Sequence, residues 1–205
     1  MPSYRHAPVM LAKFVDVMAG SNAMESVRES AMSQAVLEPS TAVTSSAPVT
    51  PVAIDHVAYP SYDAAQTHRF YVDIMGFTLA GAQTGMSRLW GKPYLLVSYQ
   101  IAPGEALAFF NCDGLAPVSH PDTPATQIHH VALRVRDREA LERWKSRLNT
   151  HEVPFVVERH GDGEHLYLLD PNEVMLELCV ATPESAAGQP QGAFDTLQRW
   201  LDGVR

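Results

Sequence analysis

The sequence predicts an α+β protein in which two βαβββ modules form a paired, cleft-bearing mixed sheet. The first observation behind this prediction is a repeat with an offset of 74 residues: the segment 54–58 (IDHVA) returns as 128–132 (IHHVA). The second is that each copy continues into a segment of helical periodicity and then into three short strand-like segments. The repeat therefore covers a whole supersecondary unit and not a pentapeptide alone.

The first module starts with a predicted strand at 52–59, in which Val52, Ile54, His56 and Ala58 share one face. A helix is predicted to follow, with start and end signals at Asp63, Gln66 and Gly76. Three further strands are predicted at 77–82, 89–99 and 106–111.

The second module repeats this order, with a strand at 128–135 and a helix that follows Asp137. Apolar residues recur along this helix at helical spacing, at Leu141, Trp144 and Leu148. Three strands are predicted at 154–159, 165–169 and 174–180, and the turn Asp170-Pro171-Asn172 separates the last two.

The repeat divides the chain into three regions. They are a tail at 1–50, a domain at 51–181 with modules at about 51–112 and 127–181, and a C-terminal tail at 182–205 with a short amphipathic helix around 194–201. The first region is expected to be weakly ordered, because it ends in a Pro/Ser/Thr-rich stretch at 38–51. A short helix within 22–37 is the alternative for part of it.

The composition suits a globular protein in the cytoplasm and excludes several functions. The 205 residues carry a net charge of −8, so no basic surface is available for nucleic acid. No apolar run approaches the roughly 20 residues that a membrane span needs. The two cysteines, Cys112 and Cys179, are too few for a disulfide framework, and we expect both to be small buried hydrophobic residues.

Glu177 lies at the centre of the otherwise apolar strand 174–180 (VMLELCV). Burying an unpaired carboxylate costs several kcal/mol, so a buried Glu177 needs a proton, a cationic partner or a metal ion. The alternative is an edge strand in which Glu177 turns to water.

His56 and His130 occupy equivalent positions of the repeat, each on an otherwise apolar face. A lone histidine there is more often a hydrogen-bonded core residue than a ligand, but a symmetric pair is predicted to face one cleft with Glu177 as third ligand. His129 points to the opposite face and is not counted as a ligand. Two imidazoles and one carboxylate suit Fe(II), Zn, Mn, Ni or Co, and three open coordination positions favour non-haem Fe(II).

These motifs resemble the vicinal oxygen chelate superfamily, which includes glyoxalase I, methylmalonyl-CoA epimerase, fosfomycin-resistance enzymes, bleomycin-resistance proteins and extradiol ring-cleaving dioxygenases. The resemblance covers about residues 51–181 and rests on the two histidine motifs and on the segment 167–177 (YLLDPNEVMLE). It implies a small-molecule substrate and the metal ligands His56, His130 and Glu177.

The resemblance also bears on the number of ligands. Glyoxalase I and the epimerase use a further Glu or Gln ligand in the first module. Phe109 or Phe110 is expected at the position that matches Glu177, and an aromatic ring cannot ligate a metal. The three-ligand pattern that remains is the one that the dioxygenases and the fosfomycin enzymes use.

The second module resembles the extradiol dioxygenase signature as well, with His160, Tyr167 and the Asp170-Pro171 turn before Glu177. Glu158 and Glu173 depart from that signature. The resemblance implies a second-sphere histidine as acid/base and a hydrogen bond from Tyr167 to substrate or oxygen. The catalytic candidates are His160, Tyr167 and His120, and the expected substrate-binding residues are His165, Phe109, Phe110, Trp90 and Tyr94. For each of these, core packing or loop exposure is the alternative.

The sequence thus predicts a metal-dependent enzyme, first of all an Fe(II) extradiol-like dioxygenase acting on a bidentate oxygen substrate such as a catechol. One alternative is a lyase, isomerase or transferase of the glyoxalase, epimerase or fosfomycin-resistance kind that uses Zn, Mn, Ni or Co. Another is a metal-free drug-binding protein. The modules pair within one chain, or they swap in a homodimer so that His56 of one chain meets His130 and Glu177 of the other.

Overall fold

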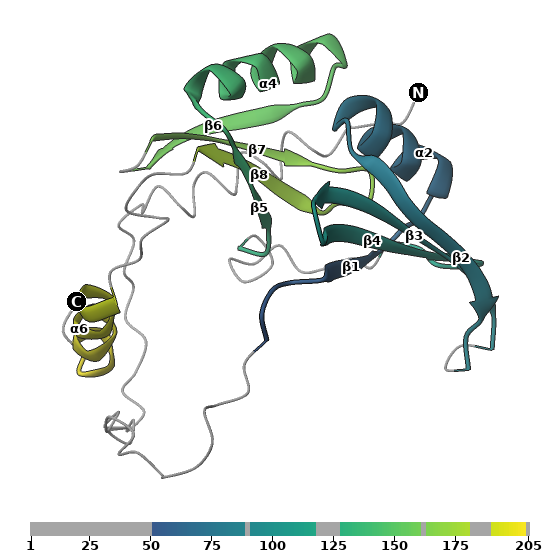
Figure 1. Cartoon of the computed structure of the whole chain (residues 1–205), viewed down its shortest axis with the longest axis horizontal. Helices are drawn as coiled ribbons and strands as arrows, with labels where there is room; N and C mark the ends of the chain where they lie inside the picture. Colours follow the sequence, from purple (N-terminus) through teal and green to yellow (C-terminus); the bar gives the residue numbers. More distant parts are fainter. Residues whose placement is uncertain (1–50, 89–90, 118–127, 161–162, 181–189, 204–205) are drawn as a thin grey trace, which may run out of the picture. The chain divides into compact units, whose positions relative to one another are not determined.

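Two four-stranded mixed sheets make up the strand content of the computed structural model, which describes residues 51–88, 91–117, 128–160, 163–180 and 190–203 (Figure 1). Their strand orders are β1-β4-β3-β2 and β5-β8-β7-β6. Each sheet has one parallel pair, between its first and last strands in the chain, and two antiparallel pairs. The predicted α+β fold with two βαβββ modules is confirmed.

The first module runs from β1 to β4, and its helix changes type along its length. Its elements are β1 (His56–Pro60), α2 (Ala64–Arg69), the π-helical turn η1 (Phe70–Ile74), β2 (Thr78–Met86), β3 (Pro93–Ala102) and β4 (Glu105–Cys112). Asp63 caps α2 by accepting from the backbone N–H groups of Ala65 and Gln66. Gly76 follows η1 with φ of 75°, a conformation that favours glycine.

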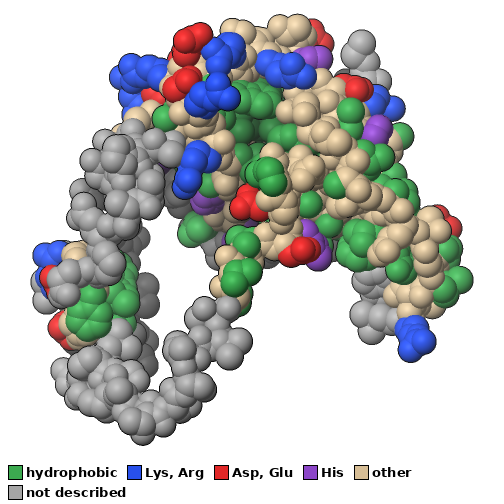
Figure 2. Space-filling view, viewed as in Figure 1, with side chains coloured by type: hydrophobic (Ala, Val, Ile, Leu, Met, Phe, Trp, Pro, Cys, Tyr) green, Lys and Arg blue, Asp and Glu red, His purple; other side chains and the backbone are tan. Residues whose placement is uncertain are grey.

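The second module runs from β5 to β8. Its elements are β5 (Val131–Val135), α4 (Arg138–Thr150), β6 (Phe155–His160), β7 (Gly163–Leu169) and β8 (Met175–Val180). Asp137 caps α4, as predicted, by accepting from the Ala140 backbone N–H at 2.7 Å. Leu141 and Leu148 are buried on the inner face of α4, whereas the Arg143–Glu139 pair is exposed. Figure 2 shows Lys, Arg, Asp and Glu side chains gathered over this part of the molecule.

Both first strands begin later than their sequence pattern predicts. Val52 and Ile54 are exposed, and β1 starts only at His56, where its pairing with Ala106 on β4 begins. Ile128 is likewise half exposed, and β5 starts at Val131. His130 therefore lies just before its strand, which leaves its ring on a loop at the end of the second sheet.

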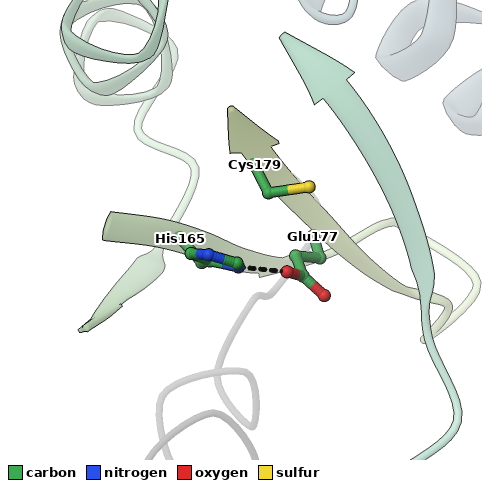
Figure 3. A group of neighbouring side chains, drawn as sticks. All are labelled: His165, Glu177 and Cys179. Carbon is green, nitrogen blue, oxygen red and sulfur yellow. Dashed lines mark hydrogen bonds and ion pairs between the residues drawn. The ribbon is translucent and has the colours of Figure 1, made fainter. Parts of the chain in front are cut away.

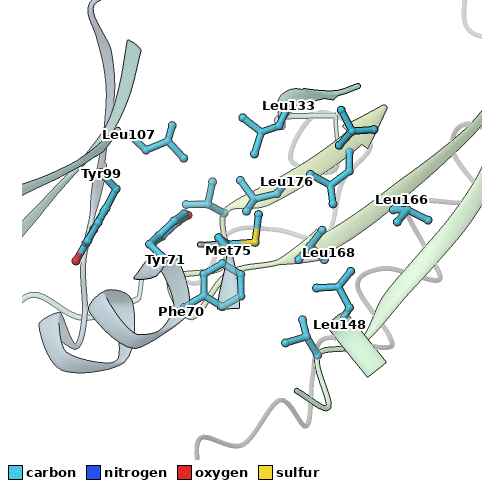
Figure 4. Close-up of a cluster of buried hydrophobic side chains, with 14 of the residues drawn as sticks. Phe70, Tyr71, Met75, Tyr99, Leu107, Leu133, Leu148, Leu166, Leu168 and Leu176 are labelled. Atoms are coloured by element: carbon cyan, nitrogen blue, oxygen red, sulfur yellow. The ribbon is translucent and has the colours of Figure 1, made fainter. Parts of the chain in front are cut away.

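One hydrophobic core joins the two modules (Figure 4). Phe70 and Tyr71 of the first module pack in the same cluster as Leu168 and Leu176 of the second. Next to this core the Tyr71 hydroxyl donates to Asp170 Oδ2 at 3.0 Å. The Tyr62 backbone N–H donates to Asn172 Oδ1 at 3.0 Å. The Asp170-Pro171-Asn172 turn therefore fastens the second module to the first.

Helix α6 (Pro190–Leu201) belongs to a separate compact unit and exposes apolar side chains that include Phe194 and Trp200. It agrees with the predicted C-terminal helix. None of the helices in the described part of the chain has the length and apolar character that a membrane crossing requires. The predictions for residues 1–50, for Trp90 and for His120 lie outside the described residues.

Candidate metal centre

Glu177 is buried in the middle of the second sheet. Strand β8 lies between β5 and β7, so that Glu177 faces Ala132 on one side and Tyr167 on the other. Only 6% of the residue is exposed. The edge-strand alternative is therefore wrong, and the carboxylate needs partners inside the protein.

Two histidines supply those partners. His130 Nε2 lies 2.9 Å from Glu177 Oε2, and His165 Nδ1 contacts Glu177 Oε1. His130 Nδ1 lies 2.7 Å from the Ile128 carbonyl oxygen, and because a carbonyl only accepts, Nδ1 is the donor. The other ring nitrogen, Nε2, faces Glu177 Oε2, and because both atoms carry lone pairs this contact requires a proton or a metal ion between them.

Cys179 completes a group of three donors around this carboxylate. A ring nitrogen of His165, a carboxylate oxygen of Glu177 and the Cys179 sulfur all lie within 4.8 Å of one another (Figure 3). No other set of three His, Cys, Asp or Glu side chains among the described residues meets this criterion. His56, His130 and Glu177 do not form such a group within the chain.

A second polar cluster adjoins the first on the same sheet. His160 Nε2 lies 3.1 Å from the Tyr167 hydroxyl and 3.4 Å from Glu158 Oε2. The His160 ring also meets His165 edge to face, with ring centroids 4.5 Å apart. The sequence-predicted catalytic pair His160 and Tyr167 is thus brought together beside Glu177.

Burial shapes the acid–base properties of this cluster. It raises the pKa of Tyr167 well above the usual range, and the Glu177 charge and hydrogen bond add to that effect. Burial also raises the pKa of Glu158; the His160 charge opposes this increase, and the Glu177 charge adds to it. Tyr167 therefore keeps its proton at neutral pH, and its hydroxyl can donate to an anionic neighbour.

His56 lies on the first sheet, beside a cavity of about 280 Å³. Its Nδ1 pairs with Asp55 Oδ1 at 2.5 Å, and half of its side chain is exposed. The residues that line the cavity come from the first module: Asp55, His56, Ala80, Leu96, Ser98, Gln100, Gly104, Glu105, Ala106 and Ala108. The first module thus offers one imidazole and an open space.

The strand registers correct the expected counterpart of Glu177. Ala58 pairs with Ala108 on β4 just as Ala132, 74 residues later, pairs with Glu177 on β8. The equivalent residue is therefore Ala108, and neither Phe109 nor Phe110. The absence of a fourth ligand at this position still holds, because alanine has no donor.

The predicted aromatic pocket is only partly assembled. Phe109 is completely buried in the core, where its ring lies 4.8 Å from that of Tyr71, so it does not line the cavity. Phe110 and Tyr94 lie on the cavity face of the sheet, with ring centroids 5.7 Å apart. Sequence reasoning treated Cys179 as packing only; its two-residue spacing from Glu177, which puts both on one face of a strand, was the available signal.

Comparisons with known proteins agree with this architecture. The family model for the Glyoxalase/Bleomycin resistance protein/Dioxygenase superfamily matches residues 53–178. A glyoxylase/bleomycin resistance protein/dioxygenase domain from Frankia sp. EAN1pec is similar over 65% of this chain and 100% of its own, with a TM-score of 0.54 and 16% identity. No curated protein matches the chain.

The fosfomycin resistance protein FosX from Listeria monocytogenes is a second similar structure. A mutant of that protein, solved with Mn(II) and 1S,2S-dihydroxypropylphosphonic acid, matches with a TM-score of 0.51 and 16% identity. The match covers 68% of this chain and 100% of FosX. At these identities the likeness concerns the fold.

Proposed function

The chain belongs to the Glyoxalase/Bleomycin resistance protein/Dioxygenase superfamily, and we propose that it is a metal-dependent enzyme whose ligands are His130 and Glu177 of the second module and His56 of the first. The observation that carries this proposal is the approach of His130 Nε2 to within 2.9 Å of the buried Glu177 carboxylate. A carboxylate buried in a strand interior is costly without a cation beside it.

The residues present fit a divalent ion. With Nδ1 at the Ile128 carbonyl, Nε2 is the His130 nitrogen that faces Glu177, and imidazole with carboxylate suits Fe(II), Mn(II), Zn(II), Ni(II) and Co(II). When bound, such an ion supplies Lewis acidity toward a bidentate oxygen substrate, and Fe(II) adds reactivity with dioxygen.

For the reaction itself we propose an extradiol-like dioxygenase that acts on a catechol-type substrate with Fe(II). The support is the contact between His160 Nε2 and the Tyr167 hydroxyl at 3.1 Å, beside Glu177. His160 takes up a proton at Nε2 and returns it, while the high pKa of Tyr167 keeps its hydroxyl a donor. Glu158 Oε2 lies 3.4 Å from the same His160 nitrogen.

The cavity on the first sheet is the proposed place for the organic part of the substrate. Its volume of about 280 Å³ suits a single aromatic ring. Small side chains, Ala106 and Ala108 among them, leave this space open, and Ser98 and Gln100 offer hydrogen bonds at its wall.

Oxygen uptake tests the reaction. The protein is loaded anaerobically with Fe(II), mixed with catechol or a substituted catechol, and exposed to air-saturated buffer. We expect substrate-dependent oxygen consumption that is lost in Glu177→Ala and kept in Glu139→Ala, a change at an exposed acidic residue of α4. Metal binding without oxygen consumption on any catechol contradicts the dioxygenase and leaves the metal-dependent enzyme standing.

One observation favours a second candidate reaction class. Cys179 lies beside Glu177. A sulfur donor favours zinc, nickel or cobalt over an iron site that reacts with oxygen. A lyase, isomerase or transferase that uses one of these ions, or manganese, is the corresponding function. It predicts turnover without oxygen.

A mixing experiment with two inactive variants shows whether His56 comes from the same chain as Glu177 or from a second chain. Chains carrying His56→Ala and chains carrying Glu177→Ala are each expected to be inactive alone. If the site is shared in a homodimer, mixing them after partial unfolding restores one intact site in a mixed dimer. A site built within a single chain gives no restoration.

A further inference from the structure

Cys179 is a donor that the proposed His56–His130–Glu177 site leaves unused. Its sulfur, a His165 ring nitrogen and a Glu177 oxygen lie within 4.8 Å of one another (Figure 3). Donors around a tetrahedral zinc ion lie roughly 3.3–3.8 Å apart, since each is about 2.0–2.3 Å from the metal. The observed separations of up to 4.8 Å are thus at most about 1 Å wider than the upper end of that range.

The sheet itself holds these donors in place. His165 pairs with Cys179 across β7 and β8, and Tyr167 pairs with Glu177 in the next position along. Residues two apart on a strand share a face, so the pairing puts all of these side chains on one face. His165 and Glu177 are buried, and Cys179 is half-buried. The arrangement needs no residue of the first module.

The donor face of the second sheet carries two buried carboxylates, which a bound cation would stabilise. Glu158 is a second buried carboxylate there, with 8% of the residue exposed. Its Oε1 atom is buried and has no hydrogen-bond partner among the described residues. Glu158 Oε2 lies 3.4 Å from His160 Nε2. Carboxylate, imidazole and thiolate groups are the donor types that a divalent ion binds, and this face carries all three.

We propose that His165, Glu177 and Cys179 bind a thiophilic divalent cation, such as Zn²⁺, Co²⁺ or Cd²⁺, within a single chain. His130 Nε2 lies 2.9 Å from the other carboxylate oxygen but does not belong to this group of three. This site goes beyond the proposed function, because it uses sulfur and does not use His56. The two sites share Glu177, so an ion held by the thiolate excludes the enzyme's three-ligand arrangement.

Cobalt makes the thiolate visible. The full chain is titrated with Co²⁺ under reducing, anaerobic conditions, and the near-ultraviolet sulfur-to-cobalt charge-transfer band is recorded. We expect the band in the wild-type protein and in Cys112→Ser, the matched control at the other cysteine. Cys179→Ser should lose it. Absence of the band in the wild-type protein, or its survival in Cys179→Ser, overturns the inference.

Cadmium and manganese provide a second measurement. Cys179→Ser should weaken Cd²⁺ binding by at least about tenfold and leave Mn²⁺ binding within about twofold, because only the soft ion prefers sulfur. Equal losses for both ions would indicate a structural effect and would contradict the inference. Circular dichroism verifies folding, and Cys179→Ala replaces the serine variant if that variant is unfolded.

His56→Ala separates this inference from the proposed function. The cobalt–thiolate band should persist in that variant, whereas metal-dependent activity should be lost. A band without activity on any substrate in the wild-type protein counts against the proposed enzyme only. Metal-dependent activity without a band counts against the single-chain thiolate site only.

Discussion

The two modules share one fold but present different chemistry on equivalent faces of their sheets. The strand registers match four positions of the first module with four of the second: Leu96 with His165, Ser98 with Tyr167, Ala108 with Glu177, and Phe110 with Cys179. At each position the second module has a metal donor or a phenol. The first module has an apolar or small side chain, and these leave a cavity of about 280 Å³.

The difference shows how a repeat can specialise without losing its core. The opposite face of each sheet keeps large apolar residues, such as Leu107 in β4 and Leu176 in β8, which meet in the shared core. Core packing constrains the size of the side chains on that face. The face that carries the donors or the cavity differs in side-chain chemistry between the two modules. The second module therefore carries most of the candidate metal ligands, and the first module carries the cavity. His56 is the one proposed ligand in the first module.

The largest effect is expected from Glu177→Ala. It removes the carboxylate that His130 and His165 both contact, so binding of Mn²⁺ or Fe²⁺ should fall to background. Removing one partner of a buried ion pair also costs several kcal/mol of stability, so circular dichroism verifies that the variant is folded. Equilibrium dialysis with elemental analysis measures the binding. Glu105→Ala, which changes an acidic residue of the other module, should bind metal normally. Equal loss of metal binding in both variants would contradict the assignment of the metal-binding carboxylate to the second module.

The next largest effect concerns the His160–Tyr167 pair. His160→Gln should lower kcat by about 10²–10⁴-fold if His160 transfers the proton, since that is the usual contribution of a general acid or base. Steady-state rates across pH measure it, and the exposed His151→Gln is the control. A change confined to KM would mean that His160 only contacts the substrate.

Asp170 tests the junction between the modules. Burial raises the pKa of Asp170 to about 6, above 3.8, although hydrogen bonds from Val174, Asn172 and Tyr71 lower it. The folded protein therefore binds this proton more tightly than the unfolded chain does. Stability from this group is fully present below about pH 4 and is lost as pH rises to about 6, a change of about 3 kcal/mol.

Asp170→Asn should remove that fall in the free energy of unfolding between pH 4 and 6. Urea denaturation at a series of pH values measures it. Glu139→Gln, an exposed change of the same charge, should keep the fall. An unchanged pH profile in Asp170→Asn would show that another group produces it.

The smallest effect compares the two helix caps. Asp63 accepts from two backbone N–H groups and from the Gln66 side chain, and these bonds lower its pKa, whereas the Asp137 side chain accepts from the Ala140 N–H. Replacing either by alanine should cost about 1 kcal/mol, with the larger loss at Asp63. Thermal unfolding at pH 7 measures both. The opposite order would mean that packing of α4 depends on its cap.

Local signals predicted the fold well. Repeated motifs, two aspartate caps and alternating strands identified both modules, because each signal lies within a few residues of chain. Strand starts were less accurate: Val52 and Ile54 alternate correctly but have no partner on β4, where pairing with β1 begins at Ala106. Alternation alone does not show where a neighbouring strand begins.

The site was predicted less completely because it depends on register. Glu177 and His130 were found from their unusual surroundings, and the structure brings them together. The match of Ala108 with Glu177, and the contact of His165 and Cys179 with Glu177, follow from pairings between strands that are distant in sequence. A shift of one residue exchanges the faces of a strand, which is why Phe109 was wrongly expected at the pocket.

The most direct test of the account is the metal content of the wild-type chain, purified anaerobically with Fe(II) available and measured by elemental analysis beside His56→Ala. We expect about one iron per wild-type chain and a large loss of iron in His56→Ala. Wild-type protein that holds no metal under these conditions, or whose iron content is the same in both proteins, would contradict the division of the ligands between the two modules.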